Sequence, residues 1–597
     1  MSLTADLPDH TPDGLLNKEL RASVESLFGP LSAPLQVQPT NPEFEGTHTL
    51  VCFPLTRQSR KSPEETARLI GERLVSESKS VASFNVVKGF LNLSLKDAIW
   101  IETFNSIAGD ADFGMFPSDG KEIMVEYSSP NTNKPLHLGH LRNNFLGYAV
   151  AEIYKALGYR VHRVQIINDR GIHICKSMAA WELFGNGETP VSSGTKGDHL
   201  VGKYYVLFDQ EFKRQIAELE AGGTAKELAE REAPIMKRAV TMLQLWEQRD
   251  PVILDLWKSM NGWVYAGFGE TYKRMGVTFE KLYYESDTYL LGKSEVMKGL
   301  EAGTFYRKED GSVWVDLTGD GLDQKVLLRS DGTSVYMTQD IGTAILRFRD
   351  FPGIEGQVYT VGNEQEYHFK VLFLILKKLG FQWAEKCFHL SYGMVDLPTG
   401  RMKSREGTVV DADDLMEEMV QEAARQSAEL GKADPSAELN EMVGIGALKY
   451  FLLKVDPKKR MMFDPSESIQ LQGNTGPFIQ YTHARICALI RKAEEQGINW
   501  NGTVTPDGIH PSERDLIRLV SKYPEMLKTA ASTYSPAVMA NYAYELAKGY
   551  NQFYQSVRIF GEPDREKFLF RISLSAQVAA GIRRSLSLLG MGAPERM

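Results

Sequence analysis

The chain has 597 residues and a formal net charge of -9 at pH 7, with 43% hydrophobic and 24% charged residues. It is too long for a single hydrophobic core, so we expect several domains. The composition is that of a soluble globular protein, and the acidic balance excludes a general nucleic-acid coat and a basic membrane-binding surface. One discriminating nucleic-acid partner is still allowed, because such binding requires only local basic patches.

Residues 1–118 are predicted to form an α+β domain, with strands at 49–53 and 90–95 and a helix at 63–77. The N-terminus carries acidic residues instead of the basic and apolar regions of a signal peptide. No apolar run is long enough to cross a membrane. The cysteines lie far apart and form no CxxC pair: Cys52, Cys175, Cys387 and Cys487. This spacing predicts no zinc site and is typical of a reducing compartment, so we expect a cytoplasmic protein without membrane contact.

A strand, a polar turn and a helix follow from residue 121. The run from Glu122 to Tyr127 predicts a buried strand, and the prolines and asparagines of 128–135 end it. Apolar residues then recur at helical spacing until Gly158 ends the helix. Such a unit directs backbone N–H groups and the positive end of a helix dipole toward a phosphate.

The helix opens with His137-Leu138-Gly139-His140. Two imidazoles three positions apart share one face of the first turn and can donate to phosphate oxygens. Gly139 leaves room for a flat base against the backbone. The pair could equally be half of a metal site or a solvated helix start, so this stretch alone leaves those alternatives open.

A second strand at 160–167 completes a βαβ unit, which predicts a doubly wound parallel sheet with ligands at the carboxyl ends of its strands. Residues 182–283 are rich in charge and helix formers and predict a helical insertion. Strands resume at 325–328, 358–361 and 389–395, and nearly everything after 411 is predicted to be helical. The segment 398–410 holds two glycines and three cations after a late strand. It is a candidate clamp for the β- and γ-phosphates, or else a solvated basic turn.

With these two elements the chain resembles class I aminoacyl-tRNA synthetases, and the arginyl-tRNA synthetases in particular. Residues 137–140 match the HIGH signature, and Arg401-Met402-Lys403-Ser404-Arg405 occupies the KMSKS position. The segments that resemble the arginyl family are 125–143, 168–171, 476–485 and 595–597. The second lysine of KMSKS is replaced by Ser404. The resemblance implies that Lys134, upstream of HIGH, supplies that charge, with Lys403 and Arg405 as alternatives.

The fold expected is a Rossmann-type doubly wound parallel sheet with a helical insertion, preceded by an α+β domain and followed by an all-α domain. The expected division is a tRNA-contacting domain at 1–118, a catalytic domain at 119–410 with its insertion at about 182–283, a helical connecting segment at 411–460, and an anticodon-binding domain at 461–597.

The resemblance implies that L-arginine is ligated to tRNA(Arg) in two steps, through an arginyl-adenylate made from ATP with Mg²⁺. No protein-bound zinc or other metal is expected. The catalytic residues implied are Lys134, His137, His140, Lys403 and Arg405. The ATP contacts implied are His137, Gly139, His140, Glu364, Gly393, Val395, Met402 and Ser404. The resemblance also suggests that the first step requires bound tRNA.

A planar guanidinium calls for carboxylates with an aromatic or amide partner. Tyr336 and Asp340 lie four residues apart on one predicted helical face, and the resemblance assigns them to the side-chain pocket. The other arginine contacts that it implies are Glu126, Ser128, Asn131 and Gln365. Without the resemblance, a core aromatic and a surface charge would explain Tyr336 and Asp340. Lysine should be rejected, because its ammonium leaves buried acceptors unsatisfied.

The tRNA contacts implied by the resemblance are Phe478, Tyr481, Arg485 and Met597. Other C-terminal aromatics could be helix-bundle core. We expect a monomer. Rival functions are a class I synthetase for cysteine or glutamate, a HIGH-type nucleotidyltransferase, and a catalytically inactive tRNA-binding synthetase paralogue. A cysteine enzyme would need a zinc cluster, the nucleotidyltransferase leaves the terminal domains unexplained, and the intact HIGH motif argues against lost catalysis.

Overall fold

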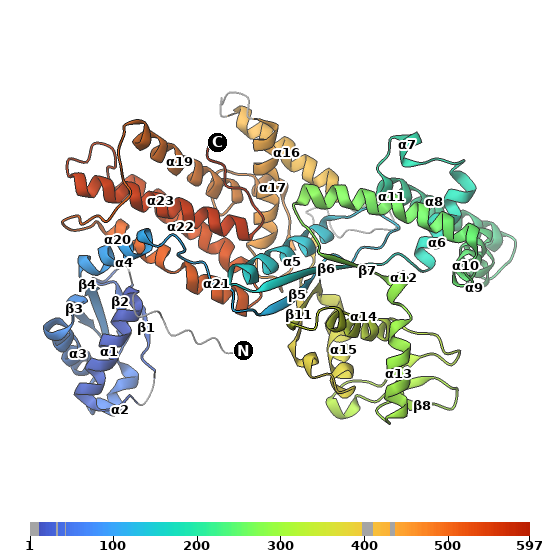
Figure 1. Ribbon diagram of the computed structural model, residues 1–597, viewed down its shortest axis with the longest axis horizontal. Coiled ribbons are helices and arrows are strands. Elements are labelled where there is room, and N and C mark those ends of the chain that lie inside the picture. The colour runs from blue at the N-terminus through green and yellow to red at the C-terminus, as the bar shows by residue number, and fades with distance from the viewer. Residues whose placement is uncertain (1–10, 32–33, 42, 397–409, 430–435) are drawn as a thin grey trace.

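The protein is described by a computed structural model over residues 11–31, 34–41, 43–396, 410–429 and 436–597. The molecule is elongated, with the N-terminal domain at one end, a parallel sheet in the middle and a helical insertion at the other end (Figure 1). Among the described residues, none of the helices is both long and apolar enough to span a bilayer.

The N-terminal domain is a four-stranded antiparallel sheet in the order β1-β2-β4-β3, covered by helices. Its strands are β1 Val37–Pro39, β2 His48–Val51, β3 Val81–Val87 and β4 Phe90–Leu95. Its main helices are α1 Pro12–Phe28, α3 Pro63–Glu77 and α4 Asp97–Gly109. The predicted helix at 63–77 and strand at 90–95 are confirmed. Ser62 caps α3 by accepting from the amide of Glu65, and Pro63 stands in the first turn, where its missing N–H costs nothing.

The central sheet has five parallel strands in the order β12-β11-β5-β6-β7, which confirms the predicted doubly wound fold. The strands are β5 Glu122–Glu126, β6 Arg160–Ile167, β7 Lys281–Tyr284, β11 Ile354–Gly362 and β12 Cys387–Tyr392. The first crossover helix is α5 Leu138–Ala156. The strand order reverses between β5 and β11, and ligands of such sheets bind at the carboxyl ends beside this reversal.

Two features of the sheet domain differ from the sequence predictions. The insertion was expected to run to about 283, but residues 281–284 form the edge strand β7. The predicted strand at 325–328 is β10 Lys325–Leu328, which pairs antiparallel with β9 Val313–Val315 in a separate small sheet. β7 is a four-residue strand that gives no periodic signal. β10 was recognised as a strand, but the sheet that it joins depends on pairing that the local sequence does not encode.

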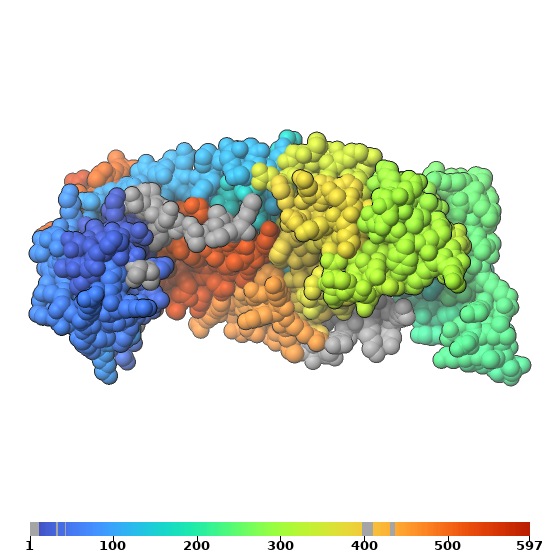
Figure 2. Space-filling view, turned by 90° about the horizontal axis from the view of Figure 1, so that it is seen from below, coloured from blue at the N-terminus to red at the C-terminus, as the bar shows by residue number. Residues whose placement is uncertain are grey.

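The insertion is built from helices, and a compact module follows it. The insertion helices are α6 Ile172–Phe184, α8 Gly197–Ala221, α9 Lys226–Glu232, α10 Pro234–Glu247 and α11 Pro251–Met275. The module contains α13 Leu291–Glu301, α14 Tyr336–Asp350 and α15 Glu366–Lys378. On the face shown in Figure 2, this module (lime and yellow) lies between the insertion and the C-terminal helices.

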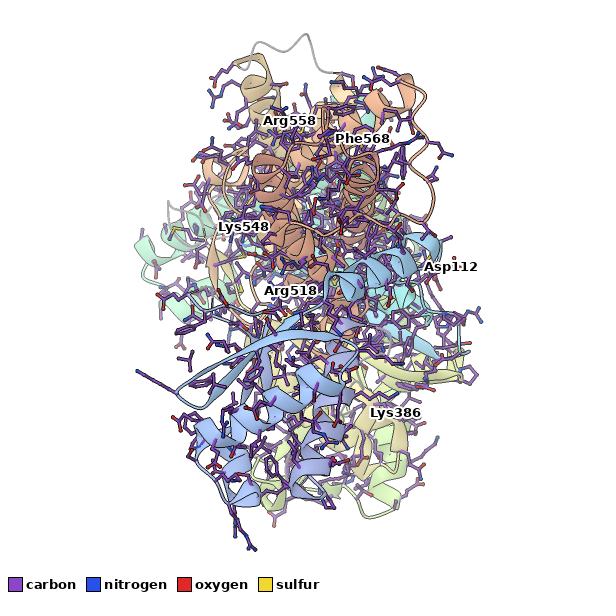
Figure 3. All side chains as sticks on the ribbon, turned by 90° about the vertical axis from the view of Figure 1, so that its left-hand side faces the viewer. Asp112, Lys386, Arg518, Lys548, Arg558 and Phe568 are labelled. Carbon is purple, nitrogen blue, oxygen red and sulfur yellow. The ribbon has the colours of Figure 1, made fainter. Side chains whose placement is uncertain are left out.

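The C-terminal region is helical, as predicted. Its main helices are α16 Ala412–Glu429, α17 Ala437–Leu453, α19 Gly476–Glu495, α20 Pro511–Ser521, α21 Tyr523–Ser532, α22 Ala537–Ser556 and α23 Arg565–Leu588. Arg518 of α20 lies where these helices meet the N-terminal domain (Figure 3). There the side chain of Asn105 donates to the carbonyl of Val504 at 2.8 Å, which ties α4 to the loop before α20.

Candidate active site

The first turn of α5 fixes two imidazoles side by side. His137 is the N-cap residue, and its Nδ1 accepts a hydrogen bond from the amide of Gly139 at 3.1 Å. Nδ1 of His140 accepts from the amide of His137 at 3.1 Å, and the ring centroids are 3.9 Å apart. The histidines therefore satisfy backbone N–H groups that a helix start would otherwise leave without partners.

Both rings are neutral at pH 7. Burial, together with the nearby charge of Lys134, lowers the pKa of His137 to about 4. Burial and the neighbouring His137 lower the pKa of His140 well below its ordinary value. Since each Nδ1 accepts a hydrogen bond, the proton of each neutral ring is assigned to Nε2. The site thus offers two neutral N–H donors that need no change of protonation to bind an anion.

The segment after the second signature motif runs beside this helix start. The amide of Leu138 donates to the carbonyl of Val410 at 3.2 Å, and the amide of Ala412 donates to the carbonyl of Leu136 at 3.0 Å. The motif itself lies outside the described residues, namely Met402, Lys403, Ser404 and Arg405. Its following segment is nevertheless joined directly to the HIGH turn.

Arg142, in the next turn of α5, holds the segment before that motif. Its buried guanidinium donates to the carbonyls of Gly393 (2.8 Å), Pro457 (3.1 Å) and Lys459 (2.9 Å). A Cβ at Gly393 would lie 2.6 Å from the backbone of the 459–460 turn, so only glycine fits there. Helix α5 is therefore hydrogen-bonded to both sides of residues 397–409.

The predicted ATP contacts outside HIGH differ in exposure. Gly393 and Val395 are buried, and the amide and carbonyl of Gly393 are hydrogen-bonded to Pro457 and to Arg142. Glu364 is exposed in the short 3-10 helix Asn363–Gln365, at the carboxyl end of β11. Lys134 lines a cavity of about 250 Å³ beside His137.

Asn143 joins the carboxyl ends of three strands. Its Oδ1 accepts from the amide of Ser128 at 2.6 Å, and its Nδ2 donates to the carbonyl of Thr360 (2.7 Å) and to the hydroxyl of Tyr392 (3.1 Å). Ser128 has a φ of +65° and no exposed surface, and its hydroxyl contacts that of Tyr272 at 2.7 Å. The contact predicted between Ser128 and arginine would have to share this hydrogen bond.

Tyr336 and Asp340 lie on one face of α14, as the spacing predicts. Tyr336 is 76% exposed, which excludes the alternative of a core aromatic. Oδ2 of Asp340 lies 2.6 Å from Nε2 of His368 on α15. Gln365 is exposed after β11, and Asn131 is exposed after β5. An aromatic ring, a carboxylate and two amides are thus available near the strand ends.

Glu126, predicted to bind arginine, has a partner that the sequence did not reveal. At the end of β5, its Oε2 accepts a hydrogen bond from Nη1 of Arg347 on α14, and both side chains are buried. Asp340 is near enough to Glu126 to disfavour its charge. The charges of the two predicted pocket carboxylates therefore interact.

A third carboxylate, Glu285, also escaped the sequence analysis. It opens the short helix α12 Glu285–Thr288 directly after β7, the strand that the sequence did not predict. Burial raises its pKa to about 7, with Arg170 opposing the rise and Asp169 and Asp340 adding to it. The sequence signal that could have identified Glu285 is its position directly after a parallel strand. That signal can be used only once β7 has been recognised as a strand.

A cluster of charges joins the insertion to the start of α16. Nζ of Lys196 lies 2.6 Å from Asp413 and 3.2 Å from Asp198, and Nε2 of His199 lies 3.2 Å from Asp411. The ligand types of a metal site are present, since the cluster holds three carboxylates and a histidine. However, the ammonium of Lys196 already lies between two of the carboxylates. We therefore interpret the cluster as an ion-pair network.

Three of the predicted tRNA contacts lie on α19, namely Phe478, Tyr481 and Arg485, whereas Met597 ends the chain. Arg485 lies over the rings of Tyr481 (5.0 Å) and Tyr554 (5.7 Å), and Tyr554 is 44% exposed. Phe478 is partly buried against the C-terminal core. Met597 lines a small cavity beside α16 and α17. Three other aromatics of this region are buried core residues: Tyr542, Tyr550 and Phe553.

Two family models match this chain. The model described as tRNA synthetases class I (R), catalytic domain, matches residues 106–464, and the DALR anticodon binding domain matches residues 479–597. The arginine–tRNA ligase of Flavobacterium psychrophilum is 55% identical over 601 residues, covering 98% of this chain and 99% of its own. That of Bacteroides thetaiotaomicron is 57% identical over 572 residues, covering 94% and 96%.

Solved structures agree in fold. The arginyl-tRNA synthetase of Thermus thermophilus has a TM-score of 0.74 at 24% identity, covering 98% of this chain and 99% of its own. That of Plasmodium falciparum has a TM-score of 0.72 at 18% identity, covering 98% of each chain. With a class I catalytic-domain match over residues 106–464 and relatives more than half identical along nearly all of the sequence, the chain belongs to the arginine–tRNA ligase family of class I aminoacyl-tRNA synthetases.

Proposed function

We propose that this chain ligates L-arginine to tRNA(Arg), using ATP, at the carboxyl ends of β5 and β11. The observation that carries the proposal is the junction of the HIGH turn with the segment that follows the second signature motif, the hydrogen bond between Leu138 and Val410. This junction supports the proposal, because it joins the N-terminus of α5 to the segment that follows the second motif, beside the point where the strand order reverses.

In the first step, the carboxylate of arginine attacks the α-phosphorus of ATP in line. A phosphorus–oxygen bond to the carboxylate forms, and the bond to the leaving pyrophosphate breaks. ATP enters as its Mg²⁺ complex, so the ion is part of the substrate. The Nε2–H groups of His137 and His140 and the N-terminus of α5 stabilise the charge that develops on the phosphate oxygens. Positioning does the rest, since phosphoryl chemistry requires little covalent help from protein.

The charge on the outer phosphates is proposed to come from Lys134, Lys403 and Arg405. Lys134 lines the cavity beside His137, which supports a contribution of its ammonium to phosphate binding. Comparing Ala variants at the three positions separates their contributions. The dominant residue is the one whose loss lowers the turnover number of adenylate formation most, with the dissociation constant of arginine unchanged.

Arginine is proposed to lie against Tyr336, with its guanidinium between Asp340 and Glu126 and with Gln365 and Asn131 near its polar backbone groups. Two carboxylates match the parallel donors of a guanidinium better than a lysine ammonium, which would leave an acceptor unpaired. Glu285 is proposed to add a third carboxyl group at the edge of this pocket, and its pKa of about 7 means that a bound guanidinium would favour its charged form.

In the second step, the 2′-hydroxyl of the terminal tRNA ribose attacks the acyl carbon, and AMP leaves. The surface around Tyr481, Arg485 and Tyr554 is proposed to stack on anticodon bases, because a half-buried guanidinium beside an exposed tyrosine ring suits unpaired bases. Phe478 and Met597 are proposed to border that surface. The N-terminal domain is proposed to contact the tRNA as well. The protein is proposed to act as a cytoplasmic monomer.

Pyrophosphate exchange into ATP tests the proposal. With tRNA(Arg) present, exchange should respond to arginine and not to lysine or glutamate. Omitting the tRNA tests separately whether the first step requires it. Exchange with another amino acid, or with none, would overturn the function and leave an inactive tRNA-binding paralogue as the alternative.

A further inference from the structure

Arg347 of α14 lies in an unusual place for a charged side chain. It is 2% exposed and lies against one face of the central sheet. Its Nη1 donates to Oε2 of Glu126, and its guanidinium carbon lies 5.2 Å from the ring centroid of Tyr283 and 5.6 Å from that of Tyr359. The resident guanidinium is thus held by one carboxylate and two aromatic rings.

The ion pair between Arg347 and Glu126 leaves more hydrogen-bonding groups without partners than a purely structural ion pair would. Nε and Nη2 of Arg347 and the hydroxyl of Tyr359 are buried and have no hydrogen-bond partner among the described residues. Buried donors without partners destabilise a fold, and a buried ion pair is often no more stabilising than an apolar pair of the same volume. Stability alone therefore does not account for Arg347.

The pair borders the proposed arginine pocket, to which Glu126 itself belongs. Asp340 and Arg347 are seven residues apart, hence two turns along the same side of α14. Glu126 pairs with Arg347, and the negative charge of Asp340 contributes to raising the pKa of Glu126. Only Oε2 of Glu126 is engaged by the hydrogen bonds between described residues, which leaves Oε1 without a partner among them.

We propose that Arg347 is a positioning residue for substrate selection: it holds Glu126 as an oriented carboxylate, so that the pocket presents two negative charges to the guanidinium of arginine. The inference rests on the proposed function, because it assumes that Glu126 faces the substrate. Arg347 itself touches neither arginine nor ATP.

The groups around Glu126 explain why a resident cation is required. Burial raises the pKa of Glu126 and Asp340 raises it further, while Arg347 opposes both. Among the described residues, the other titratable groups facing this pair are Tyr359 of β11, Tyr283 of β7 and Cys387 of β12. Arg347 is the cation among these described neighbours. Its removal therefore leaves the pKa of a buried carboxyl raised by burial and by Asp340 without opposition, which favours the protonated form of Glu126.

Calorimetric titration of the full-length protein with L-arginine, from pH 6 to 8.5, tests the inference. Arg347→Met should weaken arginine binding about 10- to 100-fold at pH 7, and the deficit relative to the unchanged protein should shrink as the pH rises. Taking the ratio of the two dissociation constants cancels ionisation of the amino acid itself. Titrations in buffers of different ionisation enthalpy should detect proton release on binding to the variant at pH 7.

Two further variants separate charge from structure. Arg347→Lys should bind arginine within about threefold of the unchanged protein, because a single hydrogen bond to Glu126 is what must be kept. Glu126→Gln should weaken binding by a factor that does not change with pH. The double variant Glu126→Gln/Arg347→Met should be no weaker than Glu126→Gln alone and should fold, since both charges are gone together.

A pH-independent deficit for Arg347→Met, or an undiminished affinity, would overturn the inference. If Arg347→Met does not fold, Arg347→Lys decides: a loss as large as that of Glu126→Gln overturns the inference, and near-normal affinity supports it. Failure of the proposed function is distinguishable, because the unchanged protein would then show no arginine-dependent pyrophosphate exchange.

Discussion

The amide of Leu138 donates a hydrogen bond to the carbonyl of Val410 across 3.2 Å. The bond joins the first turn of α5 to the segment that follows the second signature motif, although the two are far apart in the sequence. Arg142 of the same helix holds the segment that precedes the motif, through the carbonyl of Gly393. One helix therefore organises the HIGH imidazoles and both segments that flank residues 397–409.

His137→Ala should lower the turnover number of arginyl-adenylate formation about 100-fold, because it removes one preorganised donor to the phosphates. The dissociation constant of arginine should stay within about twofold. His510 is a matched control, since it caps α20 with its side chain in the same way, and His510→Ala should leave turnover unchanged. Equal losses in the two variants would mean that His137 acts only as a helix cap.

Asp340→Asn should weaken arginine binding about 10- to 100-fold, since a neutral amide attracts a guanidinium less than a carboxylate does. ATP binding should change less than about twofold. Equilibrium binding of each ligand measures both, with Glu301→Gln, an exposed position in the same module, as the control. If arginine and ATP binding fell together, Asp340 would have a structural role.

His199→Gln should show how the insertion is held to the start of α16. Ion pairs with Asp411 and Asp413 raise the pKa of His199 to about 10, above the value of about 6.5 in an unfolded chain. The stability that His199 adds is therefore complete below about pH 6.5 and is lost as the pH rises toward 10. We expect a difference in unfolding free energy of only about 1 kcal/mol, because these groups are partly screened by solvent.

Urea unfolding of both proteins at pH 6 and at pH 9.5 measures that difference. It should be larger at pH 6, and a difference that grows toward pH 9.5 would contradict the ion-pair assignment. Other titrating groups are common to the two proteins, so they cancel in the comparison.

Tyr481→Ala should raise the KM for tRNA about 10-fold or more, because stacking on a base is worth about 1–3 kcal/mol. The KM for arginine should not change. Tyr481→Phe keeps the ring and should retain most of the tRNA affinity. If neither variant altered the KM for tRNA, the anticodon surface would lie elsewhere.

The sequence predicted the elements whose signals are local. The helix at 63–77 has a serine cap and a proline start, and the helix after HIGH has a clear apolar periodicity. The parallel sheet followed from the βαβ pattern around 122–167. The spacing of Tyr336 and Asp340 also predicted their common face, because four residues is about one helical turn.

The remaining features depend on contacts that no local pattern encodes. β7 is only four residues long, so Glu285 was not recognised as a strand-end carboxylate. The pairing of Glu126 with Arg347 joins a strand to a helix far along the chain. Arginine is rarely buried, so the position of Arg347 in α14 did not predict that its side chain would be buried against the sheet. Likewise, nothing in the sequence around Ser128 indicates that Tyr272 engages its hydroxyl.

The most direct test of the account uses an ATP analogue that carries an aldehyde on its terminal phosphate. Borohydride reduction traps the amine of a nearby lysine, and mass spectrometry of the peptides identifies it. The account predicts labelling of Lys134 and Lys403, suppressed by excess ATP, because the HIGH turn and the second motif bind one triphosphate. Labelling confined to lysines outside these two segments would contradict it.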